Sequence, residues 1–372
     1  MIPTLDQSGA ERQMSLLAME LPKFGFEPSV VALNRGGYYE KWLREAGIPV
    51  TILQKRFRFD PLTWVRLRRV LNQQKPQIVQ SFLFSANSYV RLPGICPSKT
   101  KIIVSERCVD SWKSGWQLST DRRMAQKMAA MTVNSESVQQ FYQQTVGISP
   151  NRIHVIPNAV CFHQQSSDAL PAEESVSTTD LRKRFRLPDH SQLVAFIGRL
   201  AEQKCVHDLV WAFQLLRQAV DDVYLVIAGD GPERDRLADL ASRFDCRDKV
   251  IFTGHWNHSE SLLKQVDAFC LPSSFEGMSN SLMEAMLAKV PVAVSNIPAN
   301  LGLVQHEDTG LVFPEGDGPE MAKCLQKLLT NREQANSMAE AAHQKMARDF
   351  TLQQLVDRHV QLYRQICDHE SG

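Results

Sequence analysis

Two carboxylates and a run of small, polar residues separate an apolar segment from a helical segment in the second half of the chain. The apolar segment 268–271 has the composition of a buried strand, and a helical pattern follows from Ala285. Small side chains within 277–281 leave backbone N–H groups able to face an anion at the helix start. Glu276 and Glu284 flank that position and are suited to accepting hydrogen bonds from sugar hydroxyls. The stretch predicts a ligand site at the carboxyl end of a strand.

Glu284 also has an interpretation that involves no ligand. Ser281 and Glu284 have the spacing of a capping box, in which the carboxylate accepts a hydrogen bond from an N–H group at the helix end. In that case Glu284 would stabilise the helix and do nothing else. The residues alone leave both interpretations open.

Two cations follow another predicted strand, residues 193–197. Gly198 permits a tight turn after this strand, and Arg199 and Lys204 then place two positive charges at its carboxyl end. Fixed cations at such a place can neutralise a leaving diphosphate. Either one alone would be interpreted as a surface charge, but the pair favours a ligand role.

Two more strands with glycine turns lie between these motifs. Residues 223–228 are apolar and end in a turn that contains Gly229 and Gly231, and residues 250–254 repeat the design. Glycine lets another group approach the backbone closely, so Gly231 is a candidate ligand contact.

The first half of the chain begins with the same order of elements. A short apolar segment, 1–5, precedes Gly9 and a helical pattern with Met14 and Leu17 on one face, which is how a Rossmann-like domain opens. On its own, Gly9 would be an ordinary turn glycine. Further strands are predicted at 30–33, 50–53, 78–84, 101–104, 131–133 and 153–156, with helices from 38 to 46 and around 64–71.

Arg107 follows the predicted strand 101–104. Arginine cannot act as a base, but it can hold a phosphate or a carboxylate. The simpler alternative is a surface ion pair between Glu106 and Arg107. Trp112 and Trp116 stand in the next loop, where they could line a binding site or anchor the packing.

Residues 55–69 are the most basic region of the chain. Trp64 and Leu67 mark an apolar helix face, and the arginines lie largely off that face. The simpler interpretation is a solvated helix that covers a sheet. The alternative is contact with anionic lipid headgroups, to which the aromatic side chains would add apolar insertion. The residues concerned are Lys55, Arg56, Phe57, Arg58, Phe59, Trp64, Arg66, Arg68 and Arg69, with Asp60 as the only acidic residue among them.

Composition limits the class of protein. A chain of 372 residues is too long for one core, so two domains are expected, and the polar segment 163–180 is a candidate linker. A net charge of +1 gives no reason to propose nucleic acid as a partner. No run is long and apolar enough to span a bilayer, and the first residues lack a signal-peptide pattern, so a cytoplasmic protein is expected. Eight scattered cysteines without a Cys-x2-Cys pair indicate neither zinc nor a disulfide framework.

The spacing of Glu276 and Glu284, followed by Ala285-Met286 and the apolar run 290–294, resembles the signature of glycosyltransferase family 4, the retaining enzymes with a GT-B fold. The five-residue spacing of Arg199 and Lys204 is similar to the donor site of that family. The resemblance covers nearly the whole chain. It implies an α/β fold of two Rossmann-like domains that face each other across a donor/acceptor cleft. The expected parts are an acceptor-side domain 1–165, a linker 166–190, a nucleotide-sugar domain 191–348 and a C-terminal helix 349–372 that crosses back.

The resemblance also implies roles for single residues. The expected catalytic residues are Arg199, Lys204 and Glu276. The expected donor-binding residues are Gly9, Gly198, Gly231, Thr253, Gly277, Met278, Ser279, Asn280, Ser281 and Glu284, with Glu284 on the ribose. Arg107 stands where many relatives have an active-site histidine, which assigns it to the acceptor side. Cys205 and Gly302 also depart from the family pattern, which usually has glycine and glutamate there.

These observations predict a retaining glycosyltransferase that moves a sugar from a nucleotide-diphosphate donor to a hydroxyl of a glycan or lipid-linked acceptor. No Asp-x-Asp lies near the donor residues, so neither a metal nor another cofactor is expected. The expected location is cytoplasmic, with a peripheral contact at the anionic inner face of the membrane. Alternatives are a sugar-nucleotide epimerase or a phosphorylase on the same fold, or a non-catalytic scaffold that binds sugar nucleotides.

Overall fold

The computed structural model describes residues 1–57, 60–109, 113–162, 180–256 and 258–368. Residues 163–179 of the predicted linker region, with Arg58, Phe59 and Trp112, lie outside these ranges. The chain forms two compact units: Met1–Ala159 with Leu352–Gly372, and Val160–Thr351. The first unit therefore takes its last helix from the far end of the sequence.

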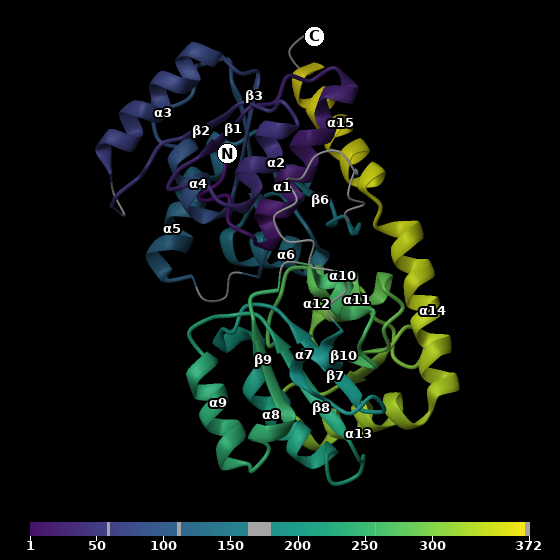
Figure 1. The fold of residues 1–372 in the computed structure, drawn as a ribbon. Coiled ribbons are helices and arrows are strands. Elements are labelled where there is room, and N and C mark those ends of the chain that lie inside the picture. The colour runs from purple at the N-terminus through teal and green to yellow at the C-terminus, as the bar shows by residue number, and fades with distance from the viewer. Residues whose placement is uncertain (58–59, 110–112, 163–179, 257, 369–372) are drawn as a thin grey trace. The chain divides into compact units, whose positions relative to one another are not determined.

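The first unit is an α/β domain (Figure 1). Its strands are β1 (Val30–Ala32), β2 (Val50–Ile52), β3 (Ile78–Phe82), β4 (Lys101–Glu106), β5 (Ala130–Val133) and β6 (Ile153–Val155). Its helices are α1 (Gly9–Glu20), α2 (Tyr38–Glu45), α3 (Pro61–Gln74), α4 (Leu83–Val90), α5 (Gly115–Met124), α6 (Glu136–Phe141) and α15 (Leu352–Asp368).

The strands of the first unit are parallel, in the orders β1-β2 and β3-β4-β5-β6. The first residues of the chain join the two groups. The Ile2 N–H donates to the Val31 carbonyl (3.0 Å), and the Phe82 N–H donates to the Met1 carbonyl (2.9 Å). The opening segment thus lies between β1 and β3, as expected for the first strand of a Rossmann-like domain.

The prediction that the strand from Ile78 continues to Phe84 is wrong. β3 ends at Phe82, and Leu83 begins α4 with a left-handed φ of 69°. A short apolar run fits a buried strand and a buried helix equally well, so the sequence could not separate the two.

Helix α15 completes the core of the first unit. Its apolar side chains Val356, Val360 and Tyr363 pack in one buried cluster with Leu17 of α1 and Ile103 of β4. Figure 1 shows α15 (yellow) beside α1 (purple). The first unit therefore buries part of its sheet under a helix that the chain supplies last.

The second unit is a second α/β domain with one parallel sheet in the order β12-β11-β10-β7-β8-β9. Its strands are β7 (Gln192–Ile197), β8 (Val223–Ala228), β9 (Val250–Gly254), β10 (Ala268–Leu271), β11 (Val292–Ser295) and β12 (Leu311–Phe313). Its helices are α7 (Leu181–Phe185), α8 (Val206–Leu216), α9 (Arg234–Arg243), α10 (Ser259–Leu263), α11 (Asn280–Leu287), α12 (Pro298–Leu301), α13 (Gly318–Thr330) and α14 (Arg332–Asp349). Helix α7 lies within the range predicted as linker.

The strand order has one point of reversal. From β7 the chain adds β8 and β9 on one side, then returns to place β10 directly against the other side of β7. In open α/β sheets, ligands bind outside the carboxyl ends of the strands at such a switch point. A ligand site is therefore expected at the loops that follow β7 and β10.

The central strands of this sheet are covered on both faces. Every residue of β8, β10 and β11 is buried, which explains their unbroken apolar sequences. Within the described part of the chain, no helix has the length and apolarity that a membrane crossing requires.

Candidate functional site

The loops after β7 and β10 meet at the switch point through a direct ion pair. The Lys204 ammonium, in the first loop, donates to Oε1 of Glu276 in the second. The Ser274 N–H donates to the Gln203 carbonyl (2.9 Å), which joins the same two loops through the backbone. Two of the three predicted catalytic residues are thereby in contact.

Glu276 is held in a defined position. Its side chain is 9% exposed, that of Lys204 is 14% exposed, and the Ser273 hydroxyl donates to the same Oε1 (2.8 Å). Within the described residues, Oε2 accepts no hydrogen bond. One oxygen therefore fixes the carboxylate, and the other remains available to a ligand hydroxyl.

Three buried polar residues that the sequence analysis missed support this loop. The Ser295 hydroxyl donates to the Ser273 carbonyl, and the Asn300 amide donates to the Ser295 carbonyl (3.1 Å). Ser273, Ser295 and Asn300 are all buried. The sequence could have indicated two of them, because Ser273 and Ser295 each stand at the carboxyl end of a predicted strand, where ligand sites of α/β sheets lie.

Helix α11 starts beside the ion pair, and its cap excludes the capping-box interpretation of Glu284. The helix begins at Asn280, and the hydroxyl of the N-cap residue Ser279 accepts from the Leu282 N–H (3.4 Å). Ser281 is therefore already helical, and Glu284 lies in the second turn, where it cannot cap the helix. Glu284 is nevertheless only 5% exposed.

Arg199 differs from Lys204 in its surroundings. It is exposed, and its side chain makes no hydrogen bond or ion pair with any described residue. The guanidinium therefore remains able to contact an anion at the carboxyl edge of β7.

The two glycines after β8 have a structural reason that involves no ligand. A Cβ added to Gly229 would lie 1.9 Å from the Gly198 carbonyl oxygen, and one added to Gly231 would lie 2.3 Å from that of Leu200. The Leu200 N–H also donates to the Asp230 carbonyl (2.9 Å). The turns after β7 and β8 therefore interlock, and this contact alone requires glycine at both positions.

The remaining predicted donor residues of the second unit follow its strands at the same edge. Thr253 is half-buried at the end of β9, and its hydroxyl donates to the Gly254 carbonyl (2.9 Å). Gly277 is buried, whereas the Met278 side chain packs against the hydrophobic core. Gly9 belongs to the other unit, where it is exposed as the first residue of α1.

Arg107 follows β4 at the carboxyl edge of the first unit's sheet. One guanidinium nitrogen donates to Oδ1 of Asn158 (3.1 Å), and the group lies over the Phe82 ring, 5.2 Å from its centroid. The predicted surface ion pair with Glu106 is wrong. Glu106 is buried and paired with Lys113 (3.3 Å), because neighbouring residues of a strand point to opposite faces.

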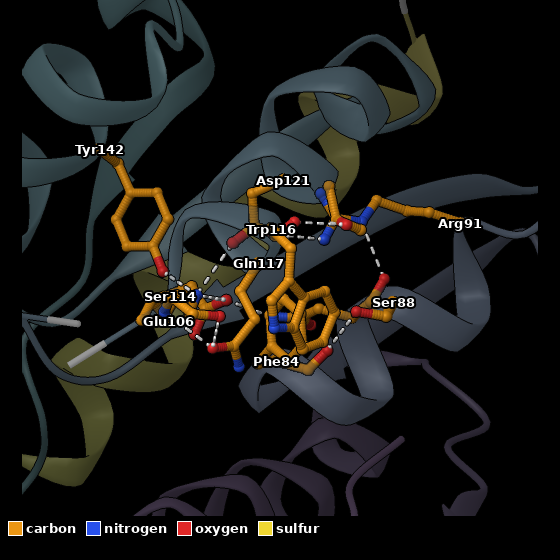
Figure 2. Close-up of polar contacts among 12 residues, drawn as sticks. Phe84, Ser88, Arg91, Glu106, Ser114, Trp116, Gln117, Asp121 and Tyr142 are labelled. Carbon is orange, nitrogen blue, oxygen red and sulfur yellow. Dashed lines mark hydrogen bonds and ion pairs between the residues drawn. The ribbon is translucent and has the colours of Figure 1, made fainter. Parts of the chain in front are cut away.

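Glu106 belongs to a buried charged cluster that no sequence motif indicated. Lys113 contacts Glu106, Asp121 (3.0 Å) and the Tyr142 hydroxyl (2.6 Å), and Arg91 contacts Asp121 (2.6 Å). Figure 2 shows Glu106, Asp121, Arg91 and Tyr142 of this cluster close together, with Phe84 and Trp116 beside them. Two cations and two anions compensate each other, so the cluster fixes the segment that follows β4.

Comparison with known proteins gives matches over both units. The model described as Glycosyltransferase Family 4 matches residues 7–163, and that of Glycosyl transferases group 1 matches residues 177–345. Alpha-D-kanosaminyltransferase of Streptomyces kanamyceticus is 28% identical over 248 residues, which are 66% of this chain and 63% of that protein. Glycogen synthase of Mycobacterium tuberculosis is 32% identical over 170 residues, 45% of this chain and 41% of that protein. The chain thus aligns with less than two thirds of these relatives.

Solved structures match over almost the whole chain. HepE of Anabaena, in complex with UDP and glucose, superposes with a TM-score of 0.79 at 18% identity and covers 98% of this chain and 99% of its own. Sucrose-phosphate synthase of Thermosynechococcus elongatus gives a TM-score of 0.78 at 16% identity, over 96% and 94% of the two chains. These structures confirm the prediction of a GT-B fold with two Rossmann-like domains.

Proposed function

Because this chain belongs to the group 1 glycosyltransferases, we propose that it transfers a sugar, with retention of configuration, from a nucleotide-diphosphate donor to a hydroxyl of a glycan or lipid-linked acceptor. The observation that carries the proposal is the contact between Lys204 and Glu276 at the switch point, beside the start of α11. Cations, a carboxylate and helix N–H groups at one sheet edge suit a phosphorylated sugar. Solved structures of the same fold hold UDP and UDP-glucose.

In the proposed reaction the second unit binds the donor. The bond between sugar and phosphate loosens toward an oxocarbenium-like state, and negative charge grows on the departing diphosphate. Arg199, Lys204 and the N-terminal N–H groups of α11 stabilise that charge. Because Lys204 and the helix N–H groups are already positioned by the loops, they require little reorganisation as the charge develops.

The carboxylates hold the donor rather than react with it. Glu276 uses one oxygen to fix Lys204, and we assign its other oxygen to hydroxyls of the sugar. We assign Glu284 to the ribose hydroxyls. The acceptor hydroxyl attacks from the face that the diphosphate leaves, and a phosphate oxygen takes its proton, so this route needs no side-chain base.

The location of the acceptor is a second part of the proposal. Helix α3 of the first unit exposes Leu62 and Val65 together with Arg66, Arg68 and Arg69, and Phe57 just before the helix is 70% exposed. The only acidic residue of this region, Asp60, is buried as the N-cap of α3. An exposed surface of arginines and apolar side chains suits an anionic membrane that carries a lipid-linked acceptor.

Donor binding is the most direct test. The full chain is incubated with a panel of nucleotide sugars, and the melting temperature is recorded for each. A donor that binds the folded state raises the melting temperature, and the rise grows with the logarithm of the donor concentration once that exceeds the Kd. Lys204→Met should abolish the rise, whereas Lys289→Met, which removes an exposed cation of the same unit, should preserve it. A wild-type chain that no nucleotide sugar stabilises would contradict the proposal.

Turnover separates the proposed reaction from those of related enzymes on the fold. A transferase releases nucleoside diphosphate when donor and acceptor are both present. Dependence on free phosphate would indicate a phosphorylase, and a changed sugar without transfer would indicate an epimerase. Binding without any of these products would indicate a scaffold.

A further inference from the structure

Among the described residues, Arg107 is a cation without an anionic partner at the carboxyl edge of the first unit's sheet. We propose that Arg107 binds an anionic group, a phosphate or a carboxylate, and that this group belongs to the acceptor. The second clause rests on the proposed function, whereas anion binding itself does not. The acceptor should therefore carry a negative charge.

The contacts of Arg107 are with neutral groups. They are the Asn158 side-chain oxygen (3.1 Å) and the Phe82 ring, and no described residue forms an ion pair with it. The side chain is half-buried, and burial lowers the pKa of Arg107 to about 10, so the group stays charged at neutral pH. A partly desolvated cation with no counter-charge is unfavourable, and a bound anion would relieve that cost.

The carboxylate next to Arg107 in the sequence, and the second carboxylate of its cluster, have other partners. Glu106, the next residue along the chain, pairs with Lys113 on the opposite face of the strand. Asp121 pairs with both Lys113 and Arg91. Figure 2 shows these acidic groups turned toward one another inside the charged cluster. The cluster is neutral within itself, so it leaves the charge of Arg107 to a ligand.

One buried polar atom of Arg107 and two of other residues in the first unit also have no hydrogen-bond partner among the described residues. They are Nε of Arg107, Oδ1 of Asn134 and Nε2 of His359. The Asn134 amide donates to the backbone carbonyl of Arg107 (3.1 Å), and the charge of Arg107 contributes to the lowered pKa of His359, so Asn134 contacts the backbone of Arg107 and His359 lies within range of its charge.

Asn134 and His359 are almost completely buried. His359 is neutral, because burial lowers its pKa to about 3, and its Nδ1 contacts the Leu355 carbonyl (2.8 Å), which leaves Nε2 as an acceptor. Arg107 thus offers a cationic donor, with two acceptors that have no described partner in its surroundings. This donor set suits an anion that also carries a hydroxyl, such as a phosphate monoester or a hydroxy acid.

The test is calorimetric titration of the full chain, without nucleotide, at constant ionic strength set with sodium chloride. The probes are inorganic phosphate and glycolate, with acetate as the carboxylate that lacks a hydroxyl. Because the cations of the second unit are also expected to bind phosphate, the titrations use an Arg199→Gln/Lys204→Met background. We expect phosphate or glycolate to bind this background, and Arg107→Gln to weaken binding roughly tenfold or more.

Tighter binding of phosphate assigns a phosphorylated acceptor, and tighter binding of glycolate assigns a carboxylated one. Absence of binding in the background, or equal binding after Arg107→Gln, would overturn the proposal. If Arg107→Gln lowers the melting temperature, Arg107→Lys takes its place. Lysine keeps the positive charge but lacks the planar guanidinium. Weaker binding of phosphate or glycolate by Arg107→Lys therefore also supports the proposal, whereas unchanged binding would overturn the assignment of the anion to the guanidinium of Arg107. Titration of the wild type with a nucleoside diphosphate tests donor binding separately, so the two proposals can fail independently.

Discussion

The ammonium of Lys204 and the carboxylate of Glu276, 72 positions apart in the sequence, are in direct contact across the switch point of the second sheet. The contact exists because β10 lies against β7, which brings together the loops that follow these strands. It gives the loops one shared charge pair, in which the anion orients the cation toward the edge where a diphosphate is expected.

Replacement of Lys204 by methionine should lower kcat more than it raises the KM for the donor. Charge on the diphosphate grows as the bond to the sugar breaks, so the cation contributes most in the transition state. Steady-state kinetics measures both quantities, with Lys289→Met as the control. A loss confined to KM would reduce Lys204 to a docking charge.

Replacement of Glu284 by alanine should weaken nucleoside diphosphate binding by about 1–3 kcal/mol, because ribose hydroxyls lose a buried acceptor. The matched control is Asp317→Ala, which removes the N-cap of α13 in the same unit and should cost about 1 kcal/mol of stability without a change in affinity. Calorimetry and thermal melts distinguish the two variants. Unchanged affinity in the Glu284 variant would exclude it from the site.

Replacement of Lys113 by methionine should destabilise the first unit by about 3–5 kcal/mol, because Glu106 and Asp121 would keep buried charges without their shared cation. Lys41→Met is the control. Lys41 lies 4.0 Å from Glu45 on an exposed helix surface, and such pairs contribute less than about 1 kcal/mol. Urea unfolding measures both variants, and equal effects would show that the cluster is not structural.

His359 should make the chain less stable in mild acid. Its pKa falls from 6.5 to about 3 in the folded state because it is buried, so between these values the unfolded chain binds a proton that the folded chain does not. Stability is therefore present above pH 6.5 and lost below it, by about 2 kcal/mol between pH 7 and pH 5. His359→Asn keeps a donor for the Leu355 carbonyl and should flatten this dependence in urea titrations. An unchanged profile would assign the acid sensitivity to other groups.

Changing Arg66, Arg68 and Arg69 to glutamine should abolish co-sedimentation with anionic vesicles at low salt, because each basic residue near such a surface contributes about 1 kcal/mol. The control changes Arg234, Arg236 and Arg243 of α9 in the second unit, which removes the same charge elsewhere. A salt series with anionic and neutral lipids completes the measurement. Binding that survives the α3 changes, or no binding by the wild type, would rule out this surface.

The sequence predicted the local design of the second unit well, because buried parallel strands are continuous apolar runs and turns with glycine separate them from helices. It could not predict that Lys204 contacts Glu276, since that depends on strand order. It also left the cap of the following helix open. Ser279 and Ser281 are both plausible caps, and only the backbone shows which one accepts the hydrogen bond.

Gly231 illustrates a contact that the sequence could not indicate. The glycine is predicted to contact the donor, which stays a prediction, and in the structure it also makes room for the backbone at Leu200. In the first unit, Arg91, Glu106, Lys113 and Asp121 come from separate elements and share no motif. Charged residues are normally exposed, so nothing in the sequence distinguished these four.

Helix α15 determines the order in which the units can fold during synthesis. Residues 1–159 are synthesised before 352–368, but Leu17 and Ile103 are covered by side chains of that helix. The intervening unit, 160–351, is synthesised in between. The core of the N-terminal unit therefore cannot be completed until its successor has been synthesised, which leaves apolar surface uncovered in the nascent chain for that time.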